Sequence, residues 1–242
     1  MFVDRKIGYR LKDLRMKCNS LIKDYVSISI PVFVSDSLLA LGTSAVAMVM
    51  GRIGTGFVSA NSITVVIQQL TTVIIQGICH ASCIMTGHTL GHGEREKAQQ
   101  QAWTFLILGL VVGILGGGLI KVLSRPIIGL YNITPETAQI AGELMDAIAF
   151  IVIFQSMNSI LTKGVLRGGG DTKFLMVADI IFLWAASLPL GILAGLVWHL
   201  DAFWIYVFLK IDQICKSIWC VFRLRSGKWI KTFSKEKMNH AQ

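Results

Sequence analysis

Two aspartates lie inside long apolar stretches of the sequence, where an ionisable side chain costs free energy and therefore indicates a function. The first is Asp36, which follows Pro31 by five residues. Ser29, Asp36 and Thr43 recur every seven residues, so they share one face of a helix. A carboxylate on such a face can bind a proton or Na⁺ and change its charge. In the alternative interpretation, this carboxylate caps a helix break at Pro31 or pairs with a basic neighbour.

The second candidate for cation binding is Asp179, which precedes a kink that Pro189 predicts in the same apolar stretch. The last apolar stretch carries three further charged residues, Lys210, Asp212 and Lys216. Asp212 and Lys216 have the i,i+4 spacing at which an acid and a base pair on one helix. We interpret these three charges mainly as internally compensated, with a functional role as the alternative.

Side chains with an amide or hydroxyl group recur every four residues along one apolar stretch and, more briefly, along another. Such stripes suit a cavity that receives polar or cationic molecules, and they suit hydrogen bonding between helices equally well. The candidate cavity residues are Thr43, Gln68, Thr72, Gln76, Gln155 and Asn158.

A cluster of cysteine and histidine residues between positions 79 and 92 raises the possibility of a metal site. Its members are Cys79, His80, Cys83, His88 and His92. The cysteines lie in an apolar helix and position 89 is Thr89, so the glutamate of an HExxH motif is missing and we expect no metal and no cofactor. No nucleophile triad, P-loop or dinucleotide fingerprint can be assembled, so an enzyme is not expected.

The composition indicates a lipid environment. Of the 242 residues, 53% are hydrophobic and only 15% are charged, which is too apolar for a soluble domain of this length. The sequence therefore predicts an all-α integral membrane protein, a bundle of six transmembrane helices. The expected spans are residues 26–51, 57–84, 102–123, 138–162, 173–198 and 202–222.

The basic residues are concentrated in the tails and alternate loops, and they set the expected topology. This arrangement explains the net charge of +9 better than nucleic-acid binding does. It places both termini in the cytoplasm, with Lys163 and Arg167 in a cytoplasmic loop. We expect an amphipathic connector helix on the membrane surface at 1–25, the six-helix lobe at 26–222 and a basic cytoplasmic tail at 223–242. The connector could instead be a solvated linker helix.

Gly109, Gly113 and Gly117 recur every four residues in the third predicted span. Small residues at this spacing let another helix backbone approach closely. We therefore predict a packing stripe here and not a binding site.

Four local strings resemble one family in the same order along nearly the whole chain. ALGTSAVAMVMGRIGTGFVSANSI (Ala40 to Ile63) is similar to the seventh helix and following loop of MATE (multidrug and toxic compound extrusion) exporters. GICHASCIMTGHTLGHGEREKA (Gly77 to Ala98) resembles a glycine-rich helix end followed by the LGxGxxxKA loop of that family. GVLRGGGDTKF (Gly164 to Phe174) is similar to its LRGxGDT loop, and RLRSGKWIK (Arg223 to Lys231) to the basic tail of some members.

The resemblance implies one lobe of a twelve-helix transporter whose two six-helix lobes face each other across the transport cleft. It implies a cation-coupled antiporter that exports organic cations, or drugs, across the plasma membrane with H⁺ or Na⁺ as the coupling ion. Acidic residues in the seventh helix of the family can bind that ion, and Asp36 occupies such a helix. The expected partners are the lipid bilayer, small organic cations, and either an N-terminal lobe or a second copy of the chain, with no nucleic acid.

Two rival functions remain open. A flippase for lipid-linked oligosaccharides belongs to the same superfamily, but its cleft would need several arginines for a pyrophosphate, and no predicted span contains one. A non-transporting membrane subunit or a truncated remnant would also fit a chain with six helices.

Overall fold

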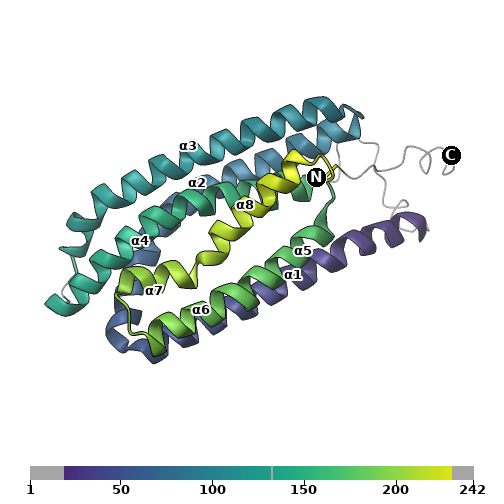
Figure 1. Cartoon of the computed structure of the whole chain (residues 1–242). Helices are drawn as coiled ribbons and strands as arrows, with labels where there is room; N and C mark the ends of the chain where they lie inside the picture. The colour runs from purple at the N-terminus through teal and green to yellow at the C-terminus, as the bar shows by residue number, and fades with distance from the viewer. Residues whose placement is uncertain (1–18, 132, 231–242) are drawn as a thin grey trace, which may run out of the picture.

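The computed structural model describes residues 19–131 and 133–230, which form an elongated bundle of helices (Figure 1). Most of the predicted connector, residues 1–18, and residues 231–242 of the predicted tail lie outside the described residues. Positions 19–25 of the predicted connector belong to the first helix without a break.

The first four helices are long and joined by short turns. They are α1 (Asn19–Ile53), α2 (Thr55–Gly91), α3 (Arg95–Ile128) and α4 (Pro135–Ser159), and α4 continues in wider π-helical turns over Ile160–Leu166. Pro135 stands in the first turn of α4, and the Thr134 hydroxyl caps this helix by accepting the backbone N–H of Thr137. Gly93, with φ +80°, allows the reversal between α2 and α3.

A second helical rod and a broken helix complete the bundle. The rod consists of α5 (Thr172–Ile180), π-helical turns (Ile181–Ser187), α6 (Leu188–Ile192) and further π-helical turns (Leu193–Val197). The last two helices are α7 (Ala202–Leu209) and α8 (Ile211–Arg225).

Five helical segments among the described residues are long and apolar enough to cross a membrane. They are Ser29–Ile53, Thr55–Gly91, Arg95–Ile128, Pro135–Leu166 and Thr172–Val197. The first four predicted spans fall inside described helices, and the fifth agrees within one residue at each end. The all-α bundle expected from the sequence is therefore present.

The sixth predicted span, 202–222, is not one continuous helix, because it breaks at Lys210 between α7 and α8. The Leu209 carbonyl, next to the break, accepts a hydrogen bond from the hydroxyl of Ser187 in the neighbouring rod. The backbone N–H of Lys210 donates to the carbonyls of Tyr206 and Val207. A broken helix is tolerated at membrane depth only where such bonds satisfy its free backbone groups.

The helices lie in two groups (Figure 1). In one group α4 packs against α2, α3, α7 and α8, and in the other α1 runs alongside α5 and α6. The segment containing α4 is the most buried of the five spans and forms the centre of the bundle. Exposed apolar side chains cover α2 and α3 on the outside, as expected for helices that face lipid.

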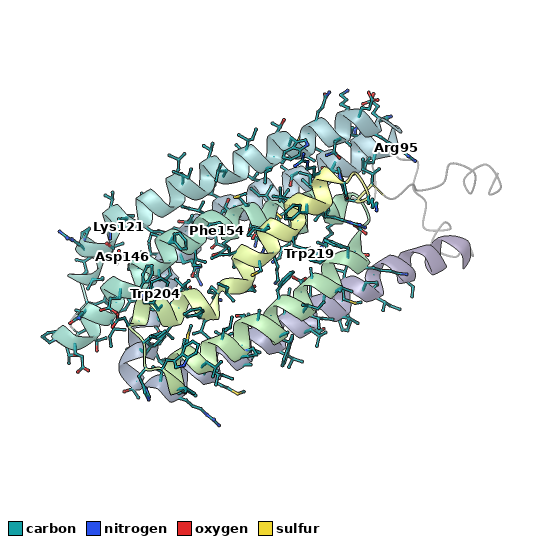
Figure 2. All side chains as sticks on the ribbon, in the orientation of Figure 1. Arg95, Lys121, Asp146, Phe154, Trp204 and Trp219 are labelled. Atoms are coloured by element: carbon teal, nitrogen blue, oxygen red, sulfur yellow. The ribbon has the colours of Figure 1, made fainter. Side chains whose placement is uncertain are left out.

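The glycine stripe of α3 packs directly on α4, as the sequence predicted. A Cβ atom at Gly113 would lie 2.8 Å from Ile153 Cα, and one at Gly117 would lie 2.5 Å from the Ala149 carbonyl oxygen. Both distances are too short for a side chain, so the stripe is what lets the two backbones meet. Lys121 of α3 and Asp146 of α4 form an ion pair beside the stripe (Figure 2).

The GVLRGGGDTKF segment anchors the residues that follow α8. The fully buried Trp229 donates its indole N–H to Gln99 Oε1 at 2.8 Å, and a Cβ at Gly169 would lie 2.5 Å from the Trp229 ring. The buried Asp171 forms an ion pair with Arg223 at 2.7 Å. These contacts tie the start of α3, the loop before α5 and the end of α8 together.

We predict that Gly117→Ala lowers the free energy of unfolding by about 1–3 kcal/mol, because the added methyl group overpacks the contact between α3 and α4. The matched control is Gly118→Ala, where an added Cβ has no atom within 4 Å. This control should be neutral or slightly stabilising, since alanine replaces glycine in a helix. Thermal unfolding of the two purified variants in detergent measures the difference, and equal losses would contradict the packing assignment.

Candidate functional site

A buried network of three charged side chains joins α5 to α8. The Nζ atom of Lys216 lies 3.0 Å from Asp179 Oδ1 and 3.2 Å from Asp212 Oδ2. The exposed fractions of the side chains are 3% for Lys216, 4% for Asp212 and 15% for Asp179. We call these three residues the Asp–Lys–Asp triad.

Neutral polar side chains extend the triad to α1 and α4. The Ser35 hydroxyl, on α1, donates to Asp179 Oδ2 at 2.6 Å. Gln213 Nε2 donates to Asp212 Oδ2 at 2.8 Å, and Gln213 Oε1 accepts from Asn158 Nδ2, on α4, at 2.7 Å. One continuous polar network therefore connects helices from both groups of the bundle.

Asp179 and Lys216 of the triad form part of the wall of a cavity of about 230 Å³ between the two groups of helices, whereas Asp212 does not line it. Of the predicted site residues, Thr43, Gln76, Gln155, Asn158 and Asp179 line it. Gln68 and Thr72 do not: Gln68 Nε2 donates to Gln155 Oε1 at 2.9 Å, and the Thr72 hydroxyl donates to the Gln68 backbone carbonyl. The polar stripes thus contribute both to the cavity wall and to a hydrogen bond between helices, the two arrangements that the sequence left open.

Asp36 does not line this cavity. Its side chain is 51% exposed, and its Oδ1 accepts from Arg167 Nη2 at 3.1 Å. This arrangement is the pairing with a basic neighbour that the sequence left as an alternative. The adjacent residue, Ser35, is the one on α1 that contacts the triad, because neighbouring residues of a helix point about 100° apart.

Lys163 and Arg167 line the cavity, although the sequence placed them in a loop. The fourth span continues through Leu166 in π-helical turns, so Lys163 belongs to the helix and Arg167 caps it. The apolar pattern alone gave no sign of this extension.

The sequence did not identify Asp212, Lys216, Ser35 or Gln213 as site residues. The i,i+4 spacing of Asp212 and Lys216 predicted their ion pair, which the structure contains. It could not show that Asp179, on another helix, shares the same ammonium group. The interpretation of this charge group as mainly self-compensating was therefore incomplete.

Two members of the cysteine and histidine cluster, His88 and His92, lie side by side in the structure. His88 and His92 are exposed, and their Nε2 atoms lie 3.4 Å apart. No group of three or more histidine, cysteine, aspartate or glutamate residues in the described chain is placed to hold a metal ion.

We predict that Lys216→Met lowers the free energy of unfolding by about 3–5 kcal/mol, because it leaves two buried carboxylates without their ammonium partner. The control is Lys121→Met, which removes an exposed ion pair and should cost at most about 1 kcal/mol. The triple variant Asp179→Asn, Asp212→Asn, Lys216→Met should recover much of the loss. Thermal unfolding in detergent tests all three, and no recovery in the triple variant would contradict the electrostatic explanation.

The MatE family model matches residues 31–193 of this chain. The probable multidrug resistance protein NorM of Xylella fastidiosa is 25% identical over 219 residues, which cover 89% of this chain and 46% of that protein. The multidrug resistance protein MdtK of Photorhabdus laumondii is 29% identical over 186 residues, covering 74% and 39%. The chain spans about half the length of the curated relatives it matches.

Solved structures share the fold. A crystal structure of MATE in the straight conformation aligns with a TM-score of 0.77 at 13% identity, over 88% of this chain and 48% of the other. The Vibrio cholerae MATE transporter VcmN in the bent form aligns with a TM-score of 0.76 at 16% identity, over 89% and 50%. The matched family model and the shared membrane-spanning fold together show that this multi-pass membrane chain belongs to the MATE family.

Proposed function

We propose that this chain forms one lobe of a proton-coupled exporter of organic cations. The observation that carries the proposal is the buried Asp–Lys–Asp triad, of which Asp179 and Lys216 line a cavity with many polar side chains. Relatives named as multidrug resistance proteins support drug export as the direction of transport.

The charges of the triad supply a physical basis for exchange. Its contacts join two carboxylates to one ammonium group, which leaves one negative charge in excess. Lys210, at the helix break, interacts electrostatically with Asp212 but forms no ion pair with a described carboxylate within 4 Å. A buried carboxylate without an ammonium partner of its own is costly, so the triad favours one additional positive charge in contact with Asp179 or Asp212. A proton on a carboxylate can provide this positive charge, and so can a cation in the cavity. Binding of one therefore lowers the affinity of the triad for the other.

The position of Lys216 favours H⁺ over Na⁺ as the coupling ion. Its ammonium group already occupies the space between the two carboxylates, where a metal ion would need several oxygen ligands. A proton needs only one carboxylate oxygen. Protonation of Asp179 or Asp212 would remove one attraction on Lys216 and so change the contacts between α5 and α8.

A second lobe would complete the transport pathway. Asp36 and Thr43 on α1 are exposed, and the relatives are about twice as long as this chain. We propose that a second six-helix lobe, either a separate N-terminal lobe or a second copy of this chain, covers this polar face. We propose, from the positive-inside distribution of charge, that Lys163, Arg167 and both termini lie on the cytoplasmic side of the plasma membrane.

The flippase alternative receives less support from the cavity. A pyrophosphate is best bound by several arginines, whereas Arg167 is the one arginine among the described residues that line the cavity.

We predict that Asp179→Asn abolishes transport driven by a pH gradient, because the asparagine amide cannot take up and release a proton. The chain is reconstituted in liposomes, alone and together with the N-terminal lobe of the Xylella fastidiosa relative, and uptake of a fluorescent organic cation is followed. Wild-type uptake should follow an imposed pH gradient and not a Na⁺ gradient.

The matched control is Asp146→Asn, which removes a carboxylate that lies outside the cavity in an exposed ion pair. It should transport like the wild type, and thermal unfolding should confirm that both variants are folded. Unchanged dependence on the pH gradient in Asp179→Asn would contradict the role of the triad. No uptake under any gradient, with or without the added lobe, would contradict export itself.

A further inference from the structure

We propose that His88 and His92 form a surface site for a divalent transition metal of the zinc class at the C-terminal end of α2. The site lies apart from the cavity, because neither histidine lines it. The inference therefore does not depend on the proposed export function. The sequence predicts no metal at the cysteine and histidine cluster as a whole, and the structure points to one at two of its members alone.

The two imidazole rings are neighbours on one face of the helix. His88 lies in the last turn of α2, and His92 follows four residues later as the C-terminal cap. The His92 backbone N–H donates to the His88 carbonyl at 3.1 Å, which keeps His92 in the helical register. Residues at i and i+4 lie side by side on a helix, and this spacing presents two histidines to one ion in helical zinc sites.

The ring nitrogens are placed as two ligands of a tetrahedral metal would be. The Nε2 atoms are 3.4 Å apart and the ring centroids 4.5 Å apart, so the rings turn their Nε2 edges toward each other. Two nitrogen ligands at about 2.0–2.1 Å from a tetrahedral Zn²⁺ lie roughly 3.3–3.4 Å from each other. A single shared proton explains the contact less well, because the usual range for N–H···O hydrogen bonds is about 2.7–3.2 Å.

The surroundings of the two histidines tolerate a bound cation. The C-terminal end of a helix carries a partial negative charge, which stabilises a cation in the last turn. The residues that follow Gly93 are Glu94, Arg95, Glu96 and Lys97, two acidic and two basic, so they add no net charge. Glu94 and Lys97 are paired with each other at 3.0 Å. A dication at His88 and His92 therefore meets no net repulsion from this segment.

The proposed site is open, with two protein ligands. Both histidines are exposed, and no group of three or more histidine, cysteine, aspartate or glutamate residues in the described ranges could hold a metal. Cys79 is buried and donates its thiol to the Ser159 carbonyl at 3.3 Å, so it is not available as a ligand. Water would fill the remaining coordination positions, and we expect weaker binding than at a structural zinc site with four protein ligands.

Metal binding would stabilise the reversal between α2 and α3. His92 directly precedes Gly93, whose φ of +80° makes the turn, and α3 begins at Arg95, which is labelled in Figure 2. A metal that bridges His88 and His92 joins the last turn of α2 to the first residue of this reversal. Local opening of the turn would then require the metal to dissociate.

The test measures binding of Zn²⁺ to the full chain, purified in detergent without a polyhistidine tag, by isothermal titration calorimetry. His88→Gln and His92→Gln should each weaken zinc binding at least about tenfold, since even groups that only support a metal ligand contribute that much. The double variant should lose no more than either single variant, because one histidine alone cannot chelate the ion.

The matched control is His80→Gln, which removes an exposed histidine of the same helix about 12 Å along its axis from His88. This variant should bind zinc like the wild type. Hydrogen exchange locates the metal: backbone amides of residues 89–95 should exchange more slowly when Zn²⁺ is added, and EDTA should reverse the effect. The double variant should show no such change.

Unchanged zinc affinity in either single variant would overturn the inference, as would an equal loss in His80→Gln. Losses that add up in the double variant would indicate two independent imidazoles and would overturn it as well. Because the substituted side chains are exposed, all four variants should unfold at the wild-type temperature in EDTA, which separates loss of the site from loss of the fold.

Discussion

The shared ammonium group of Lys216 is the interaction on which the arrangement of this helix bundle depends. It holds Asp179 of the fifth helix and Asp212 of its own helix deep in the bundle. An isolated charge at this depth would be prohibitively costly, so the helices must stay close enough to keep the three groups in contact. The hydrogen bond from Ser35 to Asp179 links α1 to the triad. Gln213 bonds to Asp212 and to Asn158, and so links α4 to the triad. A change in the charge of the triad would therefore alter the contacts of four helices, α1, α4, α5 and α8.

Two of the irregular helical segments lie next to this network. The break at Lys210 lies two residues before Asp212, and the π-helical turns after α4 bring Lys163 and Arg167 to the cavity. π-Helical turns are rare and frequently occur at functional sites. The rest of the bundle is regular and closely packed, with the glycine stripe of α3 against α4 and the Trp229 anchor at one end. The lobe thus combines a rigid frame with a locally irregular polar interior. Outside that interior, the exposed Trp219 of α8, labelled in Figure 2, stacks on Phe174 of α5.

Hydrophobic length and glycine spacing are local properties, which is why the sequence alone predicted the five long helices and the packing stripe. The break at Lys210 was missed because its backbone groups are satisfied by tertiary bonds, such as that from Ser187, which no local pattern reveals. The i,i+4 spacing of Asp212 and Lys216 predicted one ion pair, but the contact of Lys216 with Asp179 depends on how two helices meet. Asp36 was predicted from its apolar surroundings, the helix face that it shares with Thr43 and the resemblance of its helix to the family's seventh, none of which reveals its partner Arg167, 131 residues away. Of the cation-binding candidates, Asp179 is the one that lies in the cavity wall.

In the proposed exchange mechanism, a proton and a cationic substrate compensate the same excess charge of the triad, so binding of one releases the other. The most direct measurement is proton release when rhodamine B ethyl ester is added to the purified chain in weakly buffered nanodiscs, followed with a pH indicator. Protons should be released as the dye binds to the wild type, and dye binding should release none when Asp179 and Asp212 are both replaced by asparagine. Dye binding to the wild type without proton release, or equal release from the doubly substituted chain, would contradict it.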